Sequence, residues 1–373
     1  MTIFFWVCAA GAVYSYLLYP LFLMLVPKRV AGSAVKEYAP KVTIVVACRN
    51  EQRRLRHKLA NTLETRYPQR EVIVASDASD DSSDDIVREY AAQGVRLVRS
   101  PERRGKEHAQ GLAIEAAAGE IIVFTDAGTD LAPDSIDLLV DSFRDPAVGA
   151  VSSEDLFVSS DGKTAGEGAY VRYEMWLRQL ESARRGLVGL SGSFFAVRRS
   201  LVTSWDPTIP SDFTCALLAA RAGMVAVSDA RVRGIYKDVA DPSAEYGRKV
   251  RTAIRGMTAV LRNAQVLNPF RFGAFAFQVW SHKVMRWLVP WFMLGALLSA
   301  WVLSFESPVY RAFFWLQVAG YGAVALAHWL PAFRNIGPVR IGYYFVQVNL
   351  ALAAAALQFA AGKRVIVWNP STR

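Results

Sequence analysis

Residues 42–47 read Val-Thr-Ile-Val-Val-Ala, and this stretch decides the fold class. Such a near-continuous run of β-branched and small apolar residues is expected of a strand that is buried on both faces. A helix pattern follows at about 53–65, and further strand patterns follow at 71–75, 96–98 and 121–124. Strands that alternate with helices predict an α/β domain with a mainly parallel sheet.

Polar side chains follow three of these predicted strands at the point where each strand ends. They are Arg49-Asn50-Glu51, Asp77 and Thr125-Asp126. Because ligands bind at the carboxyl ends of parallel strands, we expect these residues to line one site. The sequence therefore predicts a ligand site at that edge of the sheet.

Composition indicates a chain that meets a membrane. Of its 373 residues, 53% are hydrophobic and 20% are charged, which is more apolar than an average soluble protein. The net charge is +10, but the basic residues lie beside apolar segments and without a stacking platform. This favours anionic lipid headgroups or anionic substrates and argues against a nucleic-acid partner. The cysteines, Cys8, Cys48 and Cys215, lack CxxC spacing, so we expect buried thiols in a reducing compartment.

The first apolar segment predicts a transmembrane helix. Residues 3–26 carry no charge and are long enough to cross a hydrocarbon core. A secretory signal peptide would carry basic residues before its apolar run, whereas here Lys28 and Arg29 follow it. By the positive-inside rule, we expect the α/β domain that follows on the cytoplasmic side.

Five regions follow from these patterns. They are an N-terminal transmembrane helix at 1–27, a cytoplasmic α/β domain at 41–240, amphipathic interface helices at 241–283, a transmembrane region with about three apolar segments at 284–361, and a tail at 362–373. One helix before the domain and three after it would place the tail, with Lys363 and Arg364, outside. That conflicts with the positive-inside rule. Either one C-terminal segment is interfacial or re-entrant, or the tail is an exception.

Several motifs, in the same order and at similar spacing, resemble those of glycosyltransferase family 2. Val45-Val46-Ala47-Cys48-Arg49-Asn50-Glu51 resembles the motif of its first strand, and Ser76-Asp77-Ala78-Ser79-Asp80-Asp81-Ser82 resembles the Asp motif of its second. The resemblance implies a GT-A fold and a donor pocket formed by Ala47, Arg49, Glu51 and Asp77. Asp77 would contact the base, because a carboxylate can accept the N3–H of uracil. We expect Asp80, Asp81, Asp84 and Asp85 to cap the next helix or to face solvent.

Two further segments resemble the family's donor-diphosphate site. Arg104-Gly105-Lys106 resembles its Gly-Lys segment, which implies that Lys106 faces the diphosphate and stabilises its departure. Thr125-Asp126-Ala127-Gly128 occupies the place of its Asp-x-Asp motif, whose carboxylates bind Mg²⁺ or Mn²⁺. Gly128 stands where the second Asp is expected. The metal site therefore keeps Asp126, and water, a substrate oxygen or Asp130 would complete it.

The acidic motif of the family, usually Glu-Asp, is matched by Pro210-Ser211-Asp212-Phe213. The resemblance implies that Asp212 is the general base, which takes the proton of the acceptor hydroxyl in an inverting transfer. Asp212 also begins a helix pattern, so its alternative role is that of an N-cap, and one residue could do both.

Residues 245–251 correspond in place to the Gln-x-x-Arg-Trp segment of the processive family members. Arg248 and Arg251 are the residues there that could reach a pyrophosphate. The Gln and the Trp are both missing, and the resemblance implies that this Trp stacks on a growing sugar chain, so its absence weakens the case for a polymerase. Binding to lipid headgroups is the alternative for Lys249, Arg255 and Arg262.

These motifs favour a metal-dependent, inverting glycosyltransferase of bacterial polysaccharide biosynthesis. The resemblance implies a multi-pass protein of the inner membrane with its catalytic domain in the cytoplasm. Its donor would be a nucleotide-sugar, UDP-linked, and its acceptor a lipid-linked or polysaccharide precursor; a homo-oligomer or polysaccharide-assembly partners remain open. The alternatives are a processive synthase that also secretes its polymer and a non-catalytic, nucleotide-binding membrane scaffold.

Overall fold

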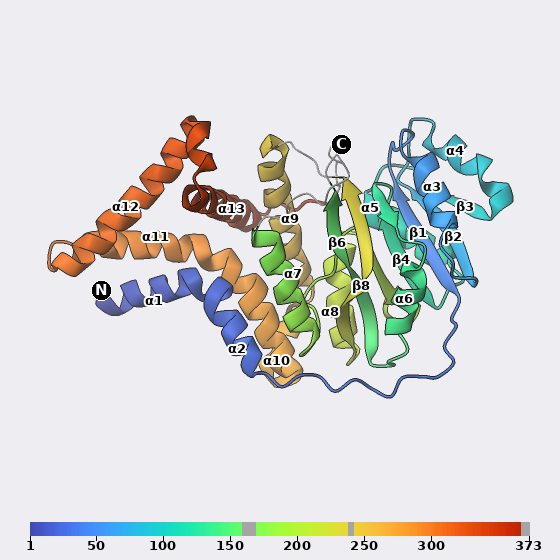
Figure 1. The fold of residues 1–373 in the computed structure, drawn as a ribbon, viewed down its shortest axis with the longest axis horizontal. Helices are drawn as coiled ribbons and strands as arrows, with labels where there is room; N and C mark the ends of the chain where they lie inside the picture. Colours follow the sequence, from blue (N-terminus) through green and yellow to red (C-terminus); the bar gives the residue numbers. More distant parts are fainter. Residues whose placement is uncertain (159–168, 238–241, 367–373) are drawn as a thin grey trace. The chain divides into compact units, whose positions relative to one another are not determined.

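The computed structural model describes residues 1–158, 169–237 and 242–366 (Figure 1). The chain divides into two compact units. One, the helical unit, consists of Met1–Leu25, Asp241–Met257 and Phe277–Arg364. The other, the sheet unit, consists of Val26–Ala240, Thr258–Ala276 and Val365–Arg373.

Within the described residues, an eight-stranded mixed sheet forms the centre of the sheet unit, in the order β3-β2-β1-β4-β7-β6-β8-β5. The strands are β1 Val42–Cys48, β2 Arg70–Ser76, β3 Val95–Arg99, β4 Ile121–Asp126, β5 Thr129–Leu131, β6 Val148–Val158, β7 Phe194–Arg198 and β8 Val225–Lys237. Strands β1 to β4 pair in parallel, and so do β6 and β8. Strand β7 is antiparallel to β4 and β6, and β5 is antiparallel to β8. The prediction of a mainly parallel α/β sheet is confirmed.

Helices cover both faces of this sheet (Figure 1). They are α3 Leu55–Leu63, α4 Ser83–Glu89, α5 Lys106–Ala116, α6 Ser135–Ser142, α7 Ala169–Ser182 and α8 Ser211–Arg221. One hydrophobic core lies on each face of the sheet, and alternate residues of β1 point into the two cores. Val42, Ile44 and Val46 pack with apolar residues of α3, α4 and α6, whereas Val45 packs with those of α5 and α8. This explains why the predicted strand is apolar at nearly every position.

The register of the parallel strands aligns their carboxyl ends. Ala47 on β1 pairs with Ala75 on β2 and with Asp126 on β4. The loops that follow β1, β2 and β4 therefore leave the sheet at the same edge. Their first polar residues, Arg49 and Asp77, lie next to this edge together with Asp126.

The helical unit holds the apolar segments. Its elements and the helices that join it to the sheet unit are α1 Thr2–Val13, α2 Tyr19–Leu25, α9 Pro242–Arg262, α10 Pro269–Val279, α11 Met285–Leu303, α12 Pro308–Trp329 and α13 Gly337–Ala360, with π-helical turns at Tyr14–Leu18 and Trp280–Val284. Among the described residues, three helical stretches are long and apolar enough to cross a membrane: Thr2–Leu25, Pro269–Leu303 and Gly337–Ala360. Helix α12 is not one of them.

Helices α1 and α11 pack closely because each offers a glycine to the other. A Cβ on Gly11 would lie 2.7 Å from the ring of Phe292, and a Cβ on Gly295 would lie 2.7 Å from Sγ of Cys8. Small residues at a helix contact let the backbones approach, which is the usual way in which apolar helices gain van der Waals contact.

Phe124 offers a test of the core beside β4. Its ring is 1% exposed, lies 4.9 Å from the ring of Phe195 and stacks on Trp205 at 5.7 Å between centroids. We expect Phe124→Ala to cost about 3–5 kcal/mol of unfolding free energy, because it leaves a cavity in a closely packed core. Thermal melting of the full chain in detergent measures this. Val30→Ala, at a residue that is 90% exposed, should leave the melting temperature unchanged; an equal loss in both variants would contradict the assignment.

Candidate active site

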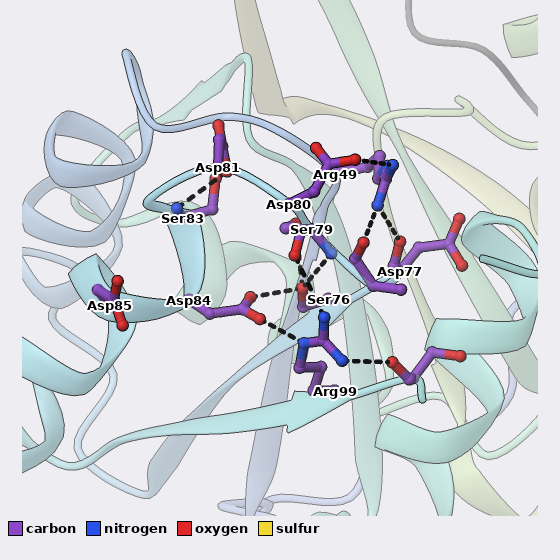
Figure 2. Close-up of polar contacts among 12 residues, drawn as sticks. Arg49, Ser76, Asp77, Ser79, Asp80, Asp81, Ser83, Asp84, Asp85 and Arg99 are labelled. Carbon is purple, nitrogen blue, oxygen red and sulfur yellow. Dashed lines mark hydrogen bonds and ion pairs between the residues drawn. The ribbon is translucent and has the colours of Figure 1, made fainter. Parts of the chain in front are cut away.

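Hydrogen bonds from Arg49 link the loop after β1 to the loop after β2 (Figure 2). Its guanidinium donates to the carbonyl oxygens of Asp77, at 3.1 Å, and of Ala78, and it pairs with Asp80 at 3.0 Å. The side-chain amide of Asn50 donates to Asp80 as well, at 2.6 Å. Asn50 and Ala78 both have positive φ, 54° and 51°. A positive φ raises the free energy of residues that carry a Cβ. The hydrogen bonds of Arg49 and Asn50 therefore hold the backbone of these two loops in a strained conformation.

Asp77 anchors the loop before α5. Its carboxylate accepts the backbone N–H of Arg104 at 2.8 Å and that of Gly105 at 3.0 Å, and the residue is only 4% exposed. Gly105 has φ 105°, a conformation that suits glycine. Since α5 begins at Lys106, the carboxylate of Asp77 fixes the place from which the Lys106 side chain starts.

Lys106 joins α5 to the end of β4. Its Nζ lies 2.6 Å from Oδ1 of Asp126 and donates to the carbonyl oxygen of Gly192 at 2.9 Å. Burial lowers the pKa of Lys106, but the nearby carboxylates of Asp126, Glu107 and Asp212 outweigh it and raise that pKa above its ordinary value. The side chain therefore stays a cation at neutral pH.

Asp212 lies beside Gly192. Its Oδ2 would be 3.3 Å from a Cβ on Gly192, so the carboxylate rests against the glycine whose carbonyl oxygen binds Lys106. The alternative role as an N-cap is wrong. Helix α8 begins at Ser211 with Pro210 at the N-cap position, which places Asp212 inside the first turn. Lys106, Asp126 and Asp212 thus converge around one glycine.

Asp126 and Asp130 flank the short turn between β4 and β5. Their side chains are 41% and 36% exposed, and Asp130 lies 3.0 Å from Nε2 of His57. No cluster of three or more His, Cys, Asp or Glu that could hold a metal occurs within the part of the chain that the structure describes. The donor set nevertheless fits Mg²⁺ or Mn²⁺, since such ions are often bound by one or two carboxylates together with substrate phosphates and water.

Lys58 is a polar residue of this region that sequence reasoning missed. It is fully buried, and its Nζ donates to Oγ1 of Thr125 at 2.9 Å and to the carbonyl oxygen of Thr129 at 2.5 Å. Burial lowers its pKa to about 7, and Asp130 and Asp126 oppose this shift. The signal was present in the sequence: Lys58 shares the buried face of α3 with Leu55, Leu59 and Thr62, at helical spacing.

Asp84 differs from the expectation that it caps a helix or faces solvent. It is 7% exposed, accepts a hydrogen bond from Ser76 at 2.6 Å and pairs with Arg99 at 2.6 Å (Figure 2). The sequence pattern could not reveal this, because Arg99 comes from the end of β3, a neighbouring strand. Asp81 does cap α4, where its carboxylate accepts the N–H of Ser83 at 2.9 Å.

A second buried network supports the loop that carries Gly192. Ser193 accepts the N–H of Asp126 on its carbonyl oxygen at 3.0 Å, and its hydroxyl contacts that of Tyr236. Tyr236 donates to Asp155 at 3.1 Å, and Ser191 donates to the same carboxylate at 2.6 Å. Burial raises the pKa of Asp155 and that of Tyr236. The segment between α7 and β7 is therefore tied to the sheet beside Asp126.

The remaining predicted donor-site residues are distributed as follows. Ala47 pairs with Asp126 in the sheet, and Glu51 donates its N–H to Ser83 at 2.9 Å at the same sheet edge. Arg248 and Arg251 lie on α9, in the helical unit, whereas all the other predicted site residues belong to the sheet unit.

Comparison with known proteins shows what this domain resembles. Residues 43–204 match the model of the family described as glycosyl transferase family 2. The chain contains a family 2 glycosyltransferase domain. Its fold is GT-A-like: the mannosyltransferase PcManGT from Pyrobaculum calidifontis, solved with GDP-Man and Mn²⁺, superposes with a TM-score of 0.75 over 97% of this chain and 99% of that one, at 24% identity.

Two curated relatives come from bacteria. Poly-beta-1,6-N-acetyl-D-glucosamine synthase of Staphylococcus epidermidis is 24% identical over 173 residues, which is 44% of this chain and 42% of the relative. Beta-monoglucosyldiacylglycerol synthase of Trichormus variabilis is 30% identical over 185 residues, 46% of this chain and 40% of the relative. The chain thus matches less than half the length of either relative.

Removing the carboxylate of Asp77 should release the loop before α5. We expect Asp77→Ala to speed amide exchange at Arg104 and Gly105 by roughly tenfold or more, because unpaired buried N–H groups cost about 1–3 kcal/mol each. Asp77→Asn keeps one acceptor oxygen and should show a smaller effect. Hydrogen exchange followed by mass spectrometry over residues 100–110 measures this. Unchanged exchange in Asp77→Ala would refute the anchoring role.

Proposed function

We propose that this protein transfers a sugar, with inversion, from a UDP-linked donor to a lipid-linked or exopolysaccharide acceptor at the cytoplasmic face of a bacterial inner membrane. The observation that carries the proposal is the convergence of Lys106, Asp126 and Asp212 around Gly192, within a family 2 glycosyltransferase domain. A cation for the leaving group, a carboxylate for a metal and a second carboxylate for a proton are the groups that such a transfer requires.

The proposed roles follow from charge. Asp212 takes the proton of the acceptor hydroxyl as its oxygen bonds to the anomeric carbon of the sugar. The bond from that carbon to the diphosphate breaks on the opposite face, so the configuration inverts. Lys106 stabilises the negative charge that gathers on the departing diphosphate. Ala47, Arg49, Glu51 and Asp77 shape the nucleotide pocket, and Arg248 and Arg251 are further candidates for the diphosphate.

We also propose a divalent cation, Mg²⁺ or Mn²⁺, at Asp126, with Asp130 as the second candidate ligand. When bound, the ion would neutralise charge on the donor phosphates. Support comes from the two half-exposed carboxylates of the β4–β5 turn and from the Mn²⁺ in the PcManGT complex.

The acceptor is proposed from the names of the relatives. One relative is a synthase of a monoglucosyl lipid, and the other makes a polymer of N-acetylglucosamine. The polymer synthase supports the processive alternative, whereas the missing Gln and Trp in the segment 245–251 favour single addition. The length of the product made by the purified chain separates the two. A non-catalytic scaffold is disfavoured, because the candidate base and the candidate cation are both present.

Substitution of the proposed base gives the direct test. We expect Asp212→Asn to lower sugar transfer by about 10²-fold or more, since general-base catalysis is worth about 10²–10⁴ in rate, and to leave nucleotide binding intact. Nucleotide release from a panel of UDP- and GDP-sugars, with membrane lipid and Mn²⁺ present, measures transfer. Asp137→Asn is the matched control, because Asp137 occupies the first turn of α6 as Asp212 does that of α8. Full activity in Asp212→Asn would exclude the assignment.

We propose that the chain crosses the membrane three times. The candidate spans Thr2–Leu25, Pro269–Leu303 and Gly337–Ala360 would place the sheet unit and Lys363 on the same side, with α12 outside the hydrocarbon core. This assignment removes the conflict with the positive-inside rule.

Cysteine labelling can check this topology, because the native Cys8, Cys48 and Cys215 are all buried. We expect a membrane-impermeant maleimide to label Glu306→Cys in intact spheroplasts and Lys363→Cys only after the membrane is opened. Labelling of both positions from the same side would rule out the three-span topology.

A further inference from the structure

The strongest unassigned feature of the sheet unit is the buried ammonium group of Lys58. It reaches from α3 to the two residues that bracket the β4–β5 turn, Thr125 and Thr129. Both of its hydrogen-bond acceptors there are neutral, a hydroxyl and a carbonyl oxygen. Burying an ion costs several kcal/mol in real proteins, and a methionine would fill the same space without this cost. Packing alone therefore does not explain why a lysine occupies this position.

The carboxylates nearest to Lys58 already have other polar partners. Asp126 is paired with Lys106 at 2.6 Å, and Asp130 lies 3.0 Å from the imidazole of His57. Both carboxylates still act on Lys58 through space. The β4–β5 turn thus presents two acidic groups to solvent while two lysine ammonium groups lie beside or behind it.

The electrostatic energy of a divalent ion at this site differs between a bare ion and an ion bound to the donor diphosphate. A bare ion at Asp126 would add two positive charges next to Lys106 and in front of Lys58. A nucleoside diphosphate that carries one divalent ion is a net anion, and a nucleotide-sugar that carries one is neutral, so neither brings the net positive charge of the bare ion close to Lys58. The same lysine would therefore oppose the bare ion but not the donor-bound one.

We propose that Lys58 is a positioning residue whose buried charge makes divalent-metal binding at Asp126 depend on the donor diphosphate. The inference rests on the proposed function, because it takes the nucleoside diphosphate as the ligand of this site. In thermodynamic terms, Lys58 supplies part of the coupling free energy between the metal and the nucleotide. The metal and the donor then bind as a pair rather than independently.

The test measures this coupling directly. Calorimetry on the full chain in detergent gives the dissociation constant of Mn²⁺ alone and at saturating UDP or GDP, and the ratio of the two is the coupling factor. The measurement is made at about pH 6, one unit below the pKa of Lys58, where the amine is protonated. We expect Lys58→Met to lower the coupling factor by about tenfold, with Mn²⁺ alone bound as tightly as before or more tightly.

Two further variants separate charge from structure. Lys58→Gln keeps a hydrogen-bond donor without the charge and should lose the coupling as Lys58→Met does. Asn61→Ala is the matched control, since Asn61 lies one turn further along α3 and ties the same hairpin through Leu131, at 2.9 and 2.8 Å, without any charge. Its coupling factor should equal that of the wild type.

The outcomes distinguish this inference from the proposed function. If the wild type binds no Mn²⁺ even at saturating UDP or GDP, the role of Lys58 and the proposed metal site are both overturned. A coupled wild type whose coupling survives in Lys58→Met and Lys58→Gln overturns the role of Lys58 alone. The same holds if Lys58→Met weakens Mn²⁺ equally with and without nucleotide, because that result indicates a structural clamp.

Discussion

The ion pair between Lys106 and Asp126 is the contact on which the candidate site depends, because it joins structure from three parts of the sheet unit. Asp77 fixes the start of α5 and thereby the base of the Lys106 side chain. The carbonyl oxygen of Ser193 holds the backbone of Asp126, and that of Gly192 completes the contacts of the Lys106 ammonium. Asp212 packs on the same glycine, and its carbonyl oxygen accepts the N–H of Leu190 at 3.3 Å. Each side chain is therefore positioned by a different element.

The sequence was sufficient for those parts of the fold that local patterns determine. The apolar run at 42–47 predicted β1 correctly, and the prediction that the ends of β1, β2 and β4 share one edge agrees with the observed register. No strand was predicted beyond residue 124, so β5, β6, β7 and β8 were all missed. Their antiparallel pairings could not be predicted, since a strand pattern does not name its neighbours. The buried pair of Asp84 and Arg99 was missed for the same reason: burial of a charge depends on a partner that is distant in the chain.

Lys58 shows a different limit of sequence reasoning. Helical spacing places it on the apolar face of α3, where a lysine is unusual, so the pattern could have marked it as buried. What the pattern could not supply is the identity of the groups at the far end of the side chain. Thr125 and Thr129 are 67 and 71 residues away in the chain. The fold alone brings this ammonium group to the turn that carries Asp126.

The departure of this chain from the Asp-x-Asp pattern can be understood through charge. A second carboxylate at position 128 would strengthen a site for a bare ion, whereas here Asp126 is already paired with the Lys106 ammonium and Asp130 contacts the imidazole of His57. Lys58, buried behind the turn, adds a further positive charge to this site when it is protonated. The missing negative charge would have to come from the donor diphosphate. A site of this kind holds little attraction for a metal until its nucleotide is present, which couples occupancy of the metal site to that of the donor site.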